Sequence, residues 1–328
     1  MEKQNDMLLQ VKDLRVYYTA GGEIINAVNG VDLEVRRGET LGLVGETGAG
    51  KTTIAKSIMR ILPDPPAKIG GGEIYLDGQE LLHLPEKKMQ EIRGKKISMI
   101  FQDPMTALNP VFTVGEQIEE VIMLHEKVNR GEAAVKARQM LELVGIPGDR
   151  SGDYPHQFSG GMKQRVVIAM ALACSPELIL ADEPTTALDV TIQAQILDMI
   201  KALKEKQNTS MILITHDLGV VAEVCDRVAV VYAGEIIEYG TKEEIFDHPT
   251  HPYTVGLFGS IPKIHEDVEW LDSIPGMPPN PADLPSGCHF HPRCSKCTQP
   301  CGEKAPEMIE VRPGHFVRCL NCTEKKES

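Results

Sequence analysis

Alternating hydrophobic and polar residues dominate the first part of the chain. A period of two places every second side chain on one face of an extended strand, so this pattern predicts half-buried strands. The predicted strands are Leu8–Lys12, Leu14–Tyr18, Ile24–Val28 and Val31–Val35, with turns at Gly21-Gly22 and Asn29-Gly30. Glycine pairs and Asn-Gly pairs are typical of turns because both accept positive φ angles.

Further along the chain, short continuous hydrophobic runs alternate with segments of helical spacing. The runs predict strands buried on both faces, and the alternation predicts an α/β fold with a mostly parallel sheet. The predicted strands are Thr40–Val44, Leu178–Ala181, Met211–Thr215 and Val228–Tyr232. The predicted helices are Lys51–Leu62, Val121–Val128, Glu132–Val144, Val190–Lys206 and Leu218–Cys225. Residues 103–174 are mostly helical in pattern, and Glu235–Tyr239 is expected to close a hairpin.

The pattern changes after Ser260, where prolines become frequent and cysteines follow. Prolines stand at positions 262, 275, 278, 279, 281 and 285. Such a segment is stiff and extended, and proline cannot donate to a sheet ladder. We therefore expect a main domain at residues 1–260 and a proline- and cysteine-rich extension at residues 261–328.

Charge and composition exclude some classes of protein. The 328 residues carry a formal net charge of −13, which disfavours nonspecific nucleic-acid binding. The longest apolar stretch, Val166–Cys174, is far shorter than the ~20 residues that a membrane-spanning helix needs. The first residues are polar and lack the apolar core of a signal peptide. We expect a cytosolic protein that reaches a membrane only through a partner.

A phosphate-binding loop lies between a predicted strand and a predicted helix. Residues Gly45–Thr52 read Gly-Glu-Thr-Gly-Ala-Gly-Lys-Thr and fit the G-x-x-x-x-G-K-[ST] pattern. The loop amides would surround the β-phosphate, Lys51 would reach the β- and γ-oxygens, and Thr52 would ligate Mg²⁺. This strand–loop–helix order indicates a nucleoside triphosphate site.

Polar residues end three further hydrophobic strands. Asp182 and Glu183 follow Leu178–Ala181, which would let one carboxylate approach magnesium and the other orient a water molecule. His216 follows Met211–Thr215; such a histidine is often structural, but beside a phosphate site it favours contact with the γ-phosphate. Gln102 also follows an apolar strand, where its amide could ligate Mg²⁺ or orient water.

A second candidate phosphate cradle lies at Ser159-Gly160-Gly161, at the start of a predicted helix. Its backbone N–H groups and hydroxyl are suited to an anion. One active site has little use for two cradles so far apart in sequence. Two copies of the chain arranged head to tail would use both.

The order of these motifs, with Ala187-Leu188-Asp189 after the acidic pair, resembles the ATP-binding-cassette (ABC) ATPases over about residues 7–260. The resemblance implies a P-loop NTPase fold with a RecA-like core, an antiparallel β subdomain and a helical subdomain, here followed by a small cysteine-rich extension. It also implies that two cassettes enclose ATP, with the P-loop of one facing the Ser-Gly-Gly segment of the other.

The same resemblance assigns roles to residues. Glu183 would be the general base, His216 would hold the γ-phosphate, and Gln102 would sense Mg²⁺ and couple to a membrane subunit. Tyr18 would stack on adenine, although neighbouring Tyr17 is an alternative. The residues expected to contact ATP are Tyr18, Gly45, Glu46, Thr47, Gly48, Ala49, Gly50, Lys51, Thr52, Thr53, Gln102, Ser159, Gly160, Gly161 and Asp182. Those expected to ligate Mg²⁺ are Thr52, Gln102 and Asp182.

Longer motifs resemble the dipeptide/oligopeptide importer branch, which includes nickel importers. They are Phe101–Pro110, the Gly-Gly-Met-Lys-Gln-Arg form of the signature, His251-Pro252-Tyr253-Thr254 and Gly287–Cys294. The resemblance implies an ATPase at the cytoplasmic face of the membrane, with two permease subunits, a second ATPase subunit and an extracytoplasmic binding protein. Import of nickel or another small solute is the alternative, and a soluble ATPase acting on DNA or ribosomes is a more distant one.

Six of the eight cysteines fall between Cys288 and Cys322. In a cytosolic protein such crowding indicates metal binding before disulfides. Spacing permits a zinc site at Cys294-x2-Cys297 and Cys319-x2-Cys322, or a [4Fe–4S] cluster on four thiolates. The branch resemblance favours the cluster, with Zn²⁺ as the alternative. The expected cluster ligands are Cys288, Cys294, Cys301 and Cys319.

Overall fold

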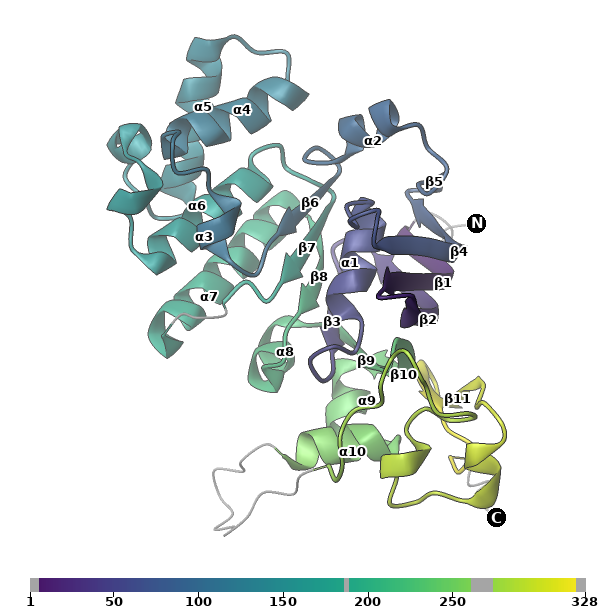
Figure 1. Ribbon diagram of the computed structural model, residues 1–328. Coiled ribbons are helices and arrows are strands. Elements are labelled where there is room, and N and C mark those ends of the chain that lie inside the picture. The colour runs from purple at the N-terminus through teal and green to yellow at the C-terminus, as the bar shows by residue number, and fades with distance from the viewer. Residues whose placement is uncertain (1–5, 186–188, 261–273, 323–328) are drawn as a thin grey trace. The chain divides into compact units, whose positions relative to one another are not determined.

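The computed structural model describes residues 6–185, 189–260 and 274–322 (Figure 1). The chain divides into two compact units. The first contains Met1–Leu8, Val35–Thr40 and Leu76–Ile214, and the second contains Leu9–Glu34, Leu41–Tyr75 and Thr215–Ser328. Within the described ranges, no helix combines the length and hydrophobicity required to cross a bilayer.

Three parallel strands form the centre of the first unit. They are β6 (Ile97–Ile100), β7 (Leu178–Asp182) and β8 (Ser210–Ile214), with β7 between the other two. All three are buried along their whole length, as the continuous hydrophobic runs predict. Because the strands are parallel, the polar residues that follow β6 and β7 emerge at the same edge of the sheet.

Helices make up most of the rest of the first unit, which confirms the helical pattern of residues 103–174. Two of them begin with a capping box. In each, the N-cap side chain accepts from the backbone N–H of the glutamate three residues later, and the side chain of that glutamate accepts from the N-cap backbone N–H. The box at Thr113 starts one helix seven residues before the predicted Val121. The elements are β5 (Gln79–Glu80), α2 (Glu86–Ile92), α3 (Pro104–Ala107), α4 (Val114–His125), α5 (Arg130–Leu143), η1 (Gly148–Gly152), η2 (Pro155–Gln157), α6 (Gly160–Leu172) and α7 (Val190–Gln207).

The second unit begins with long strands rather than the four short ones predicted. They are β1 (Met7–Ala20), β2 (Glu23–Arg36) and β4 (Ala67–Leu76), with β1 between β2 and β4. The turn predicted at Gly21-Gly22 is present, but the one predicted at Asn29-Gly30 is wrong. Gly30 has φ +80 inside β2, and the Asn29 backbone N–H and side chain donate to Gly234 and Ala233 carbonyls. These distant partners hold the Asn-Gly pair within a strand.

A second sheet in this unit has the order β3, β9, β10, β12, β11. Strands β3 (Thr40–Val44) and β9 (Arg227–Tyr232) are parallel, and β9 forms the predicted hairpin with β10 (Glu235–Thr241). Strands β11 (Met308–Arg312) and β12 (His315–Arg318) form an unpredicted hairpin, and β12 pairs with β10. The Pro313-Gly314 pair between them is a turn signal that could have revealed it.

Short helices complete the second unit. They are α1 (Lys51–Met59), α8 (Leu218–Val224), α9 (Lys242–Asp247), α10 (Pro252–Gly259), η3 (His291–Arg293) and η4 (Gln299–Gly302). Helix α1 ends three residues before the predicted Leu62, because Arg60 adopts a left-handed conformation. A Cβ added at Gly42 would lie 3.0 Å from Sγ of Cys225. Cys225 therefore packs against β3 as a core residue.

A buried acid joins β10 to β12 and to the start of α10. Glu238 is fully buried, and its Oε1 lies 2.7 Å from Nε2 of His315. The same carboxylate accepts from the backbone N–H groups of Thr250 and His251, at 2.7 and 2.8 Å. Since a buried carboxylate is stable only when its oxygens are paired, this network connects residues near the C-terminus to the sheet.

We expect the folded protein to lose stability in mild acid because of His251. Burial lowers its pKa to about 4, and its Nδ1 accepts a hydrogen bond from the Tyr253 backbone N–H at 3.0 Å. Between about pH 6.5 and pH 4 the unfolded chain binds a proton there that the folded chain does not. The contribution of His251 to the unfolding free energy should therefore be constant above about pH 6.5 and fall by roughly 3 kcal/mol toward pH 4.

Denaturant unfolding at several pH values measures this effect. His251→Asn should remove that part of the acid sensitivity, whereas the same change at His83, whose side chain is 84% exposed, should leave it. Identical pH profiles for wild type and His251→Asn would show that His251 is not responsible.

Candidate functional site

The loop between β3 and α1 has the backbone of a phosphate cradle. Gly45, Gly48 and Gly50 all have positive φ angles. A Cβ at Gly45 would lie 2.1 Å from the Val231 carbonyl oxygen, and one at Gly50 would lie 2.4 Å from that of Ala27, so only glycine fits. Helix α1 has no side-chain cap at its start, and the N–H groups in the first turn of a helix are suited to contact an anion. These features fit the triphosphate of ATP.

Lys51 lies at the first position of α1 and is buried. Its Nζ donates to the carbonyl oxygens of Gly45 and Glu46, at 2.7 and 2.9 Å. The ammonium group is thus held inside the turn of the loop. This placement agrees with the predicted role of contacting phosphate oxygens, which accept from an ammonium more strongly than neutral carbonyls do.

Two neighbouring tyrosines on β1 point to different places. The hydroxyl of Tyr18 lies 3.2 Å from the Thr53 hydroxyl on α1. The Tyr17 ring instead lies beside Gly70 on β4, where an added Cβ would be 3.1 Å from it. Of the two, Tyr18 contacts the helix that follows the phosphate loop, and its stacking on adenine stays a prediction.

Gln102 and Glu183 are brought together in the first unit. Gln102 follows β6 and Glu183 follows β7, and the amide Nε2 donates to the carboxylate Oε2 at 2.7 Å. Glu183 has φ 47, and its backbone N–H donates to the Ile214 carbonyl at 2.8 Å. A left-handed glutamate costs roughly 1–2 kcal/mol, which the pairing of this N–H with the end of β8 helps to offset.

Asp182 and His216 are the other two predicted site residues at strand ends. Asp182 ends β7 and is 4% exposed. His216 follows β8 by two residues and is exposed to solvent. Next to it, Asp217 caps α8 by accepting from the N–H groups of Gly219 and Val220. The predicted oxygen ligands for Mg²⁺, namely Thr52, Gln102 and Asp182, are of the chemical type that Mg²⁺ prefers.

The Ser-Gly-Gly segment starts α6 and lines a hollow. Ser159 is the N-cap, and its Oγ accepts from the Met162 N–H at 3.4 Å. Phe158 is buried under the Arg150 guanidinium, 4.3 Å from the ring centroid. Ser159, Gly160, Gly161 and four further residues, including Asp189, line a cavity of about 380 Å³. Ala187 and Leu188 of the neighbouring motif lie outside the described residues.

The iron–sulfur prediction is wrong. Over residues 6–185, 189–260 and 274–322, no group of three or more His, Cys, Asp or Glu side chains is arranged to hold a metal ion. Cys288, Cys294, Cys301 and Cys319 therefore do not form the expected cluster site, and the zinc alternative fails by the same finding.

The cysteine sulfurs have individual partners instead. The Cys301 sulfur lies 3.3 Å from the Thr298 hydroxyl, and the Cys322 thiol donates to the Thr250 carbonyl at 3.6 Å. Burial raises the pKa of Cys288 to about 11. A hydrogen bond from Cys322 lowers the pKa of Cys319 to about 6. Spacing alone had not specified where these side chains point.

One contact at the phosphate loop had no sequence signal. The Glu46 carboxylate pairs with Arg293, which is 247 positions away. Hydrogen bonding to Glu46 raises the pKa of Arg293, so the guanidinium stays charged. The sequence singled out Arg293 only as a member of the Gly287–Cys294 motif, without a role.

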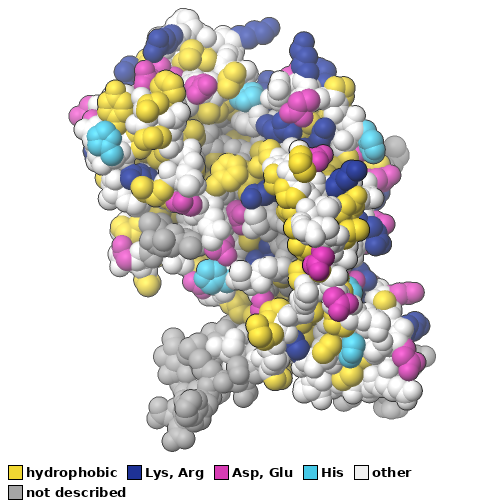
Figure 2. All heavy atoms as spheres, viewed as in Figure 1, with side chains coloured by type: hydrophobic (Ala, Val, Ile, Leu, Met, Phe, Trp, Pro, Cys, Tyr) yellow, Lys and Arg dark blue, Asp and Glu magenta, His cyan; other side chains and the backbone are white. Residues whose placement is uncertain are grey.

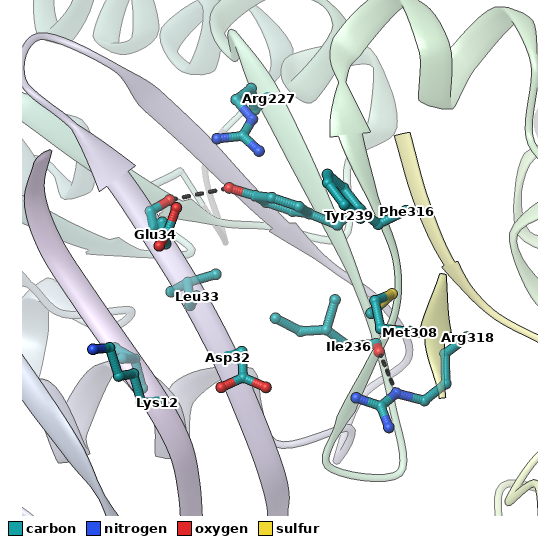
Figure 3. A pocket seen from close by; sticks show the side chains of 11 residues that line it. Lys12, Asp32, Leu33, Glu34, Arg227, Ile236, Tyr239, Met308, Phe316 and Arg318 are labelled. Carbon is teal, nitrogen blue, oxygen red and sulfur yellow. Dashed lines mark hydrogen bonds between the residues drawn. The ribbon is translucent and has the colours of Figure 1, made fainter. Parts of the chain in front are cut away.

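A separate pocket of about 440 Å³ lies in the second unit (Figure 3). Hydrophobic residues such as Leu33 and Ile236 and charged residues such as Lys12, Glu34 and Arg318 line it. Tyr239 donates to the Glu34 carbonyl at 3.1 Å, and Arg318 donates to that of Ile236 at the same distance. None of the predicted site residues lines this pocket.

Comparison with known proteins agrees with this geometry. The chain is 52% identical over 314 residues to the oligopeptide transport ATP-binding protein OppD of Bacillus subtilis, which covers 95% of this chain and 88% of that protein. It is 48% identical to OppD of Escherichia coli K12 over 99% of this chain and 96% of that one. The chain belongs to the ABC transporter ATP-binding proteins.

Two family models and a solved structure also match the chain. Residues 28–186 match the ABC transporter family, and residues 237–301 match the oligopeptide/dipeptide transporter C-terminal region. The dimeric post-hydrolysis structure of the ATP-binding cassette MJ0796, bound to ADP and Pi, is 30% identical with a TM-score of 0.65. It covers 72% of this chain and 99% of that one. The predicted ABC cassette fold is confirmed.

Proposed function

We propose that this chain is the ATP-hydrolysing subunit that energises import of dipeptides and oligopeptides through a membrane permease. The observation that carries the proposal is the similarity to oligopeptide transport ATP-binding proteins over 95% and 99% of the chain. The match at residues 237–301 to the C-terminal region of such transporters supports it. In this proposal, residues 1–260 are the nucleotide-binding domain and residues 261–328 are a C-terminal extension.

ATP would bind through the phosphate loop. The uncapped start of α1 and the amides of Gly45–Thr52 would hold the β-phosphate, and Lys51 would exchange its loop carbonyls for phosphate oxygens. Tyr18 would cover the adenine. Thr52, Asp182 and Gln102 would hold Mg²⁺, which when bound neutralises charge on the phosphates.

Glu183 would act as the general base toward the attacking water. Its carboxylate already accepts one hydrogen bond from Gln102, at 2.7 Å, which fixes its orientation. Gln102 would contribute an amide oxygen to Mg²⁺ when the metal is bound, and so would sense its presence. His216 would donate a hydrogen bond to the γ-phosphate while water attacks it. Catalysis of this kind consists mainly of positioning water and stabilising charge.

A second ATPase subunit would complete the site. The hollow at Ser159-Gly160-Gly161 is open and lined by a helix start, which suits the phosphates of ATP bound to another chain. The dimeric arrangement of the related MJ0796 cassette supports this pairing. The partner would be a second copy of this chain or a sister ATPase.

The permease would dock on the first unit near Gln102. The residues that follow Gln102 expose large hydrophobic side chains: Met105 is 62% exposed, Val111 71% and Phe112 48%. Figure 2 shows hydrophobic side chains at the surface over the helices of this unit. Exposed apolar groups of this size are typical of a protein interface. Docking there would hold the chain peripherally at the cytoplasmic face, while an extracytoplasmic binding protein delivers the peptide.

Co-purification tests this function. A tagged chain expressed in its own cells should be recovered from detergent-solubilised membranes with two permease subunits and an ATPase partner. Its membrane association should disappear when the permease genes are deleted. Recovery from the soluble fraction with ribosomes or DNA, unaffected by that deletion, would support the soluble-ATPase alternative instead.

A further inference from the structure

The second residue of the phosphate loop is held by a residue from near the C-terminus. The two carboxylate oxygens of Glu46 accept from Nη1 and Nη2 of Arg293, at 2.8 and 3.0 Å. The Arg293 side chain is only 6% exposed, and that of Glu46 is 26% exposed. Two parallel bonds between charged groups are strong and fix the relative orientation of both. The pair therefore links the loop to the C-terminal extension.

Further contacts fix the guanidinium itself. Nε of Arg293 donates to the Pro275 carbonyl at 3.0 Å, and Nη1 also lies 3.4 Å from the Tyr232 hydroxyl. The guanidinium carbon lies 6.0 Å from the centroid of the Phe290 ring. Since each guanidinium nitrogen has a partner, the direction from which Arg293 approaches Glu46 is set by the surrounding structure.

Aromatic packing holds the backbone of Glu46 as well. The Glu46 N–H donates to the Tyr253 hydroxyl at 2.9 Å. The Tyr253 ring is fully buried and packs against Tyr232 and Phe290, with centroids 4.7 and 5.5 Å away. Phe290 and Arg293 thus reach the same loop residue, one through Tyr253 and the other through the carboxylate.

The proline-rich segment forms a wall beside the same loop. Pro278, Pro279, Pro281 and Leu284 line a cavity of about 160 Å³ together with residues 46–49 of the loop. The Asn26 N–H of β2 donates to the Pro281 carbonyl at 2.9 Å. This bond attaches the proline-rich segment to β2 beside the phosphate loop.

The pair also matters electrostatically. Glu46 places a negative charge in a loop whose ligand is a polyanion, and like charges at short range disfavour binding. Arg293 neutralises that carboxylate and turns it away from solvent. Moreover, the Glu46 carbonyl accepts from Lys51 Nζ at 2.9 Å, so a shift of Glu46 also moves an acceptor of the phosphate-binding lysine.

We propose that Arg293 is a positioning residue for ATP binding, through which the C-terminal extension sets the affinity of the phosphate loop. Arg293 acts by holding and neutralising Glu46. This inference rests on the proposed function only in that the loop binds ATP. Peptide import does not enter it.

Titration of the purified full chain with a fluorescent ATP analogue, alongside kcat and KM for ATP, tests the proposal. Arg293→Gln should weaken binding and raise KM about tenfold, with kcat within about twofold, because the unpaired carboxylate acts on binding. Arg293→Lys, which keeps the charge but not the paired bonds, should weaken binding about threefold. Adding Glu46→Gln to Arg293→Gln should restore affinity to within about threefold, because the unpaired charge is gone.

Arg318→Gln is the matched control. Arg318 lies in the same extension and donates to the Ile236 carbonyl, so this change should leave ATP affinity as in the wild type. Equal affinity in Arg293→Gln and wild type would overturn the inference. So would a loss in Arg293→Gln that Glu46→Gln fails to restore, because that result indicates only damaged folding. If the wild-type chain itself fails to bind ATP, the proposed function fails first.

Discussion

Glu183→Gln is expected to abolish nearly all steady-state ATP hydrolysis while leaving ATP binding intact. Removal of a general base typically lowers kcat by about 10²–10⁴-fold. Glutamine has nearly the same shape, so the hydrogen-bonding position opposite Gln102 and the backbone bond to Ile214 can persist. The variant should therefore accumulate as an ATP-bound pair of subunits. Single-turnover hydrolysis and nucleotide content after gel filtration measure both effects.

The matched control is Glu177→Gln, just before the same strand. Glu177 pairs at the surface with Arg37 and Lys96, so the change removes a carboxylate of similar size away from the proposed chemistry. Its ATPase rate should equal that of the wild type. Equal rates for Glu183→Gln and Glu177→Gln would remove Glu183 from the role of base.

Lys51→Ala is expected to have the second largest effect, on binding rather than turnover. Lys51 is buried and supplies a positive charge where the β- and γ-phosphates are expected. A charge-assisted hydrogen bond in such a site contributes about 2–4 kcal/mol, so ATP affinity should fall by roughly 30–1,000-fold. The change also removes the ammonium donor from the Gly45 and Glu46 carbonyls. Isothermal titration with ATP and Mg²⁺ measures the loss.

Lys56→Ala provides the comparison, because Lys56 lies in the last turn of the same helix. It should bind ATP within about twofold of wild type, since the effect of a helix start falls off within one turn. Comparable losses for both variants would mean that helix stability, rather than the Lys51 ammonium, determines ATP affinity.

The parts of the site that the sequence predicted are those that a short motif or the order of strands and helices encodes. A Cβ at position 45 or 50 would lie less than 2.5 Å from a backbone oxygen, so both positions require glycine. The G-x-x-x-x-G pattern contains these two glycines and therefore predicts the loop. Gln102 and Glu183 meet because each follows a strand of one parallel sheet, and strand order at such an edge follows from the α/β pattern.

The parts that were missed depend on contacts between distant residues. Nothing near Glu46 indicates Arg293, because neither period nor spacing relates positions so far apart. Asn29-Gly30 has the composition of a turn, yet hydrogen bonds to Ala233 and Gly234 keep it in β2. The metal-site prediction for the cysteines failed for a similar reason. Spacing gives only the number of residues between cysteines, whereas metal ligation depends on the direction of their side chains, which the surrounding fold sets.

Peptide uptake tests the central claim most directly. Cells that lack this chain should lose uptake of a radiolabelled tripeptide, and the wild-type chain should restore it. The same cells carrying Glu183→Gln should remain at the background level, while the Glu177→Gln chain restores uptake fully. Labelled nickel measured in parallel should be unaffected throughout. Full peptide uptake without the chain, or with Glu183→Gln as the only copy, would contradict an ATPase that powers peptide import.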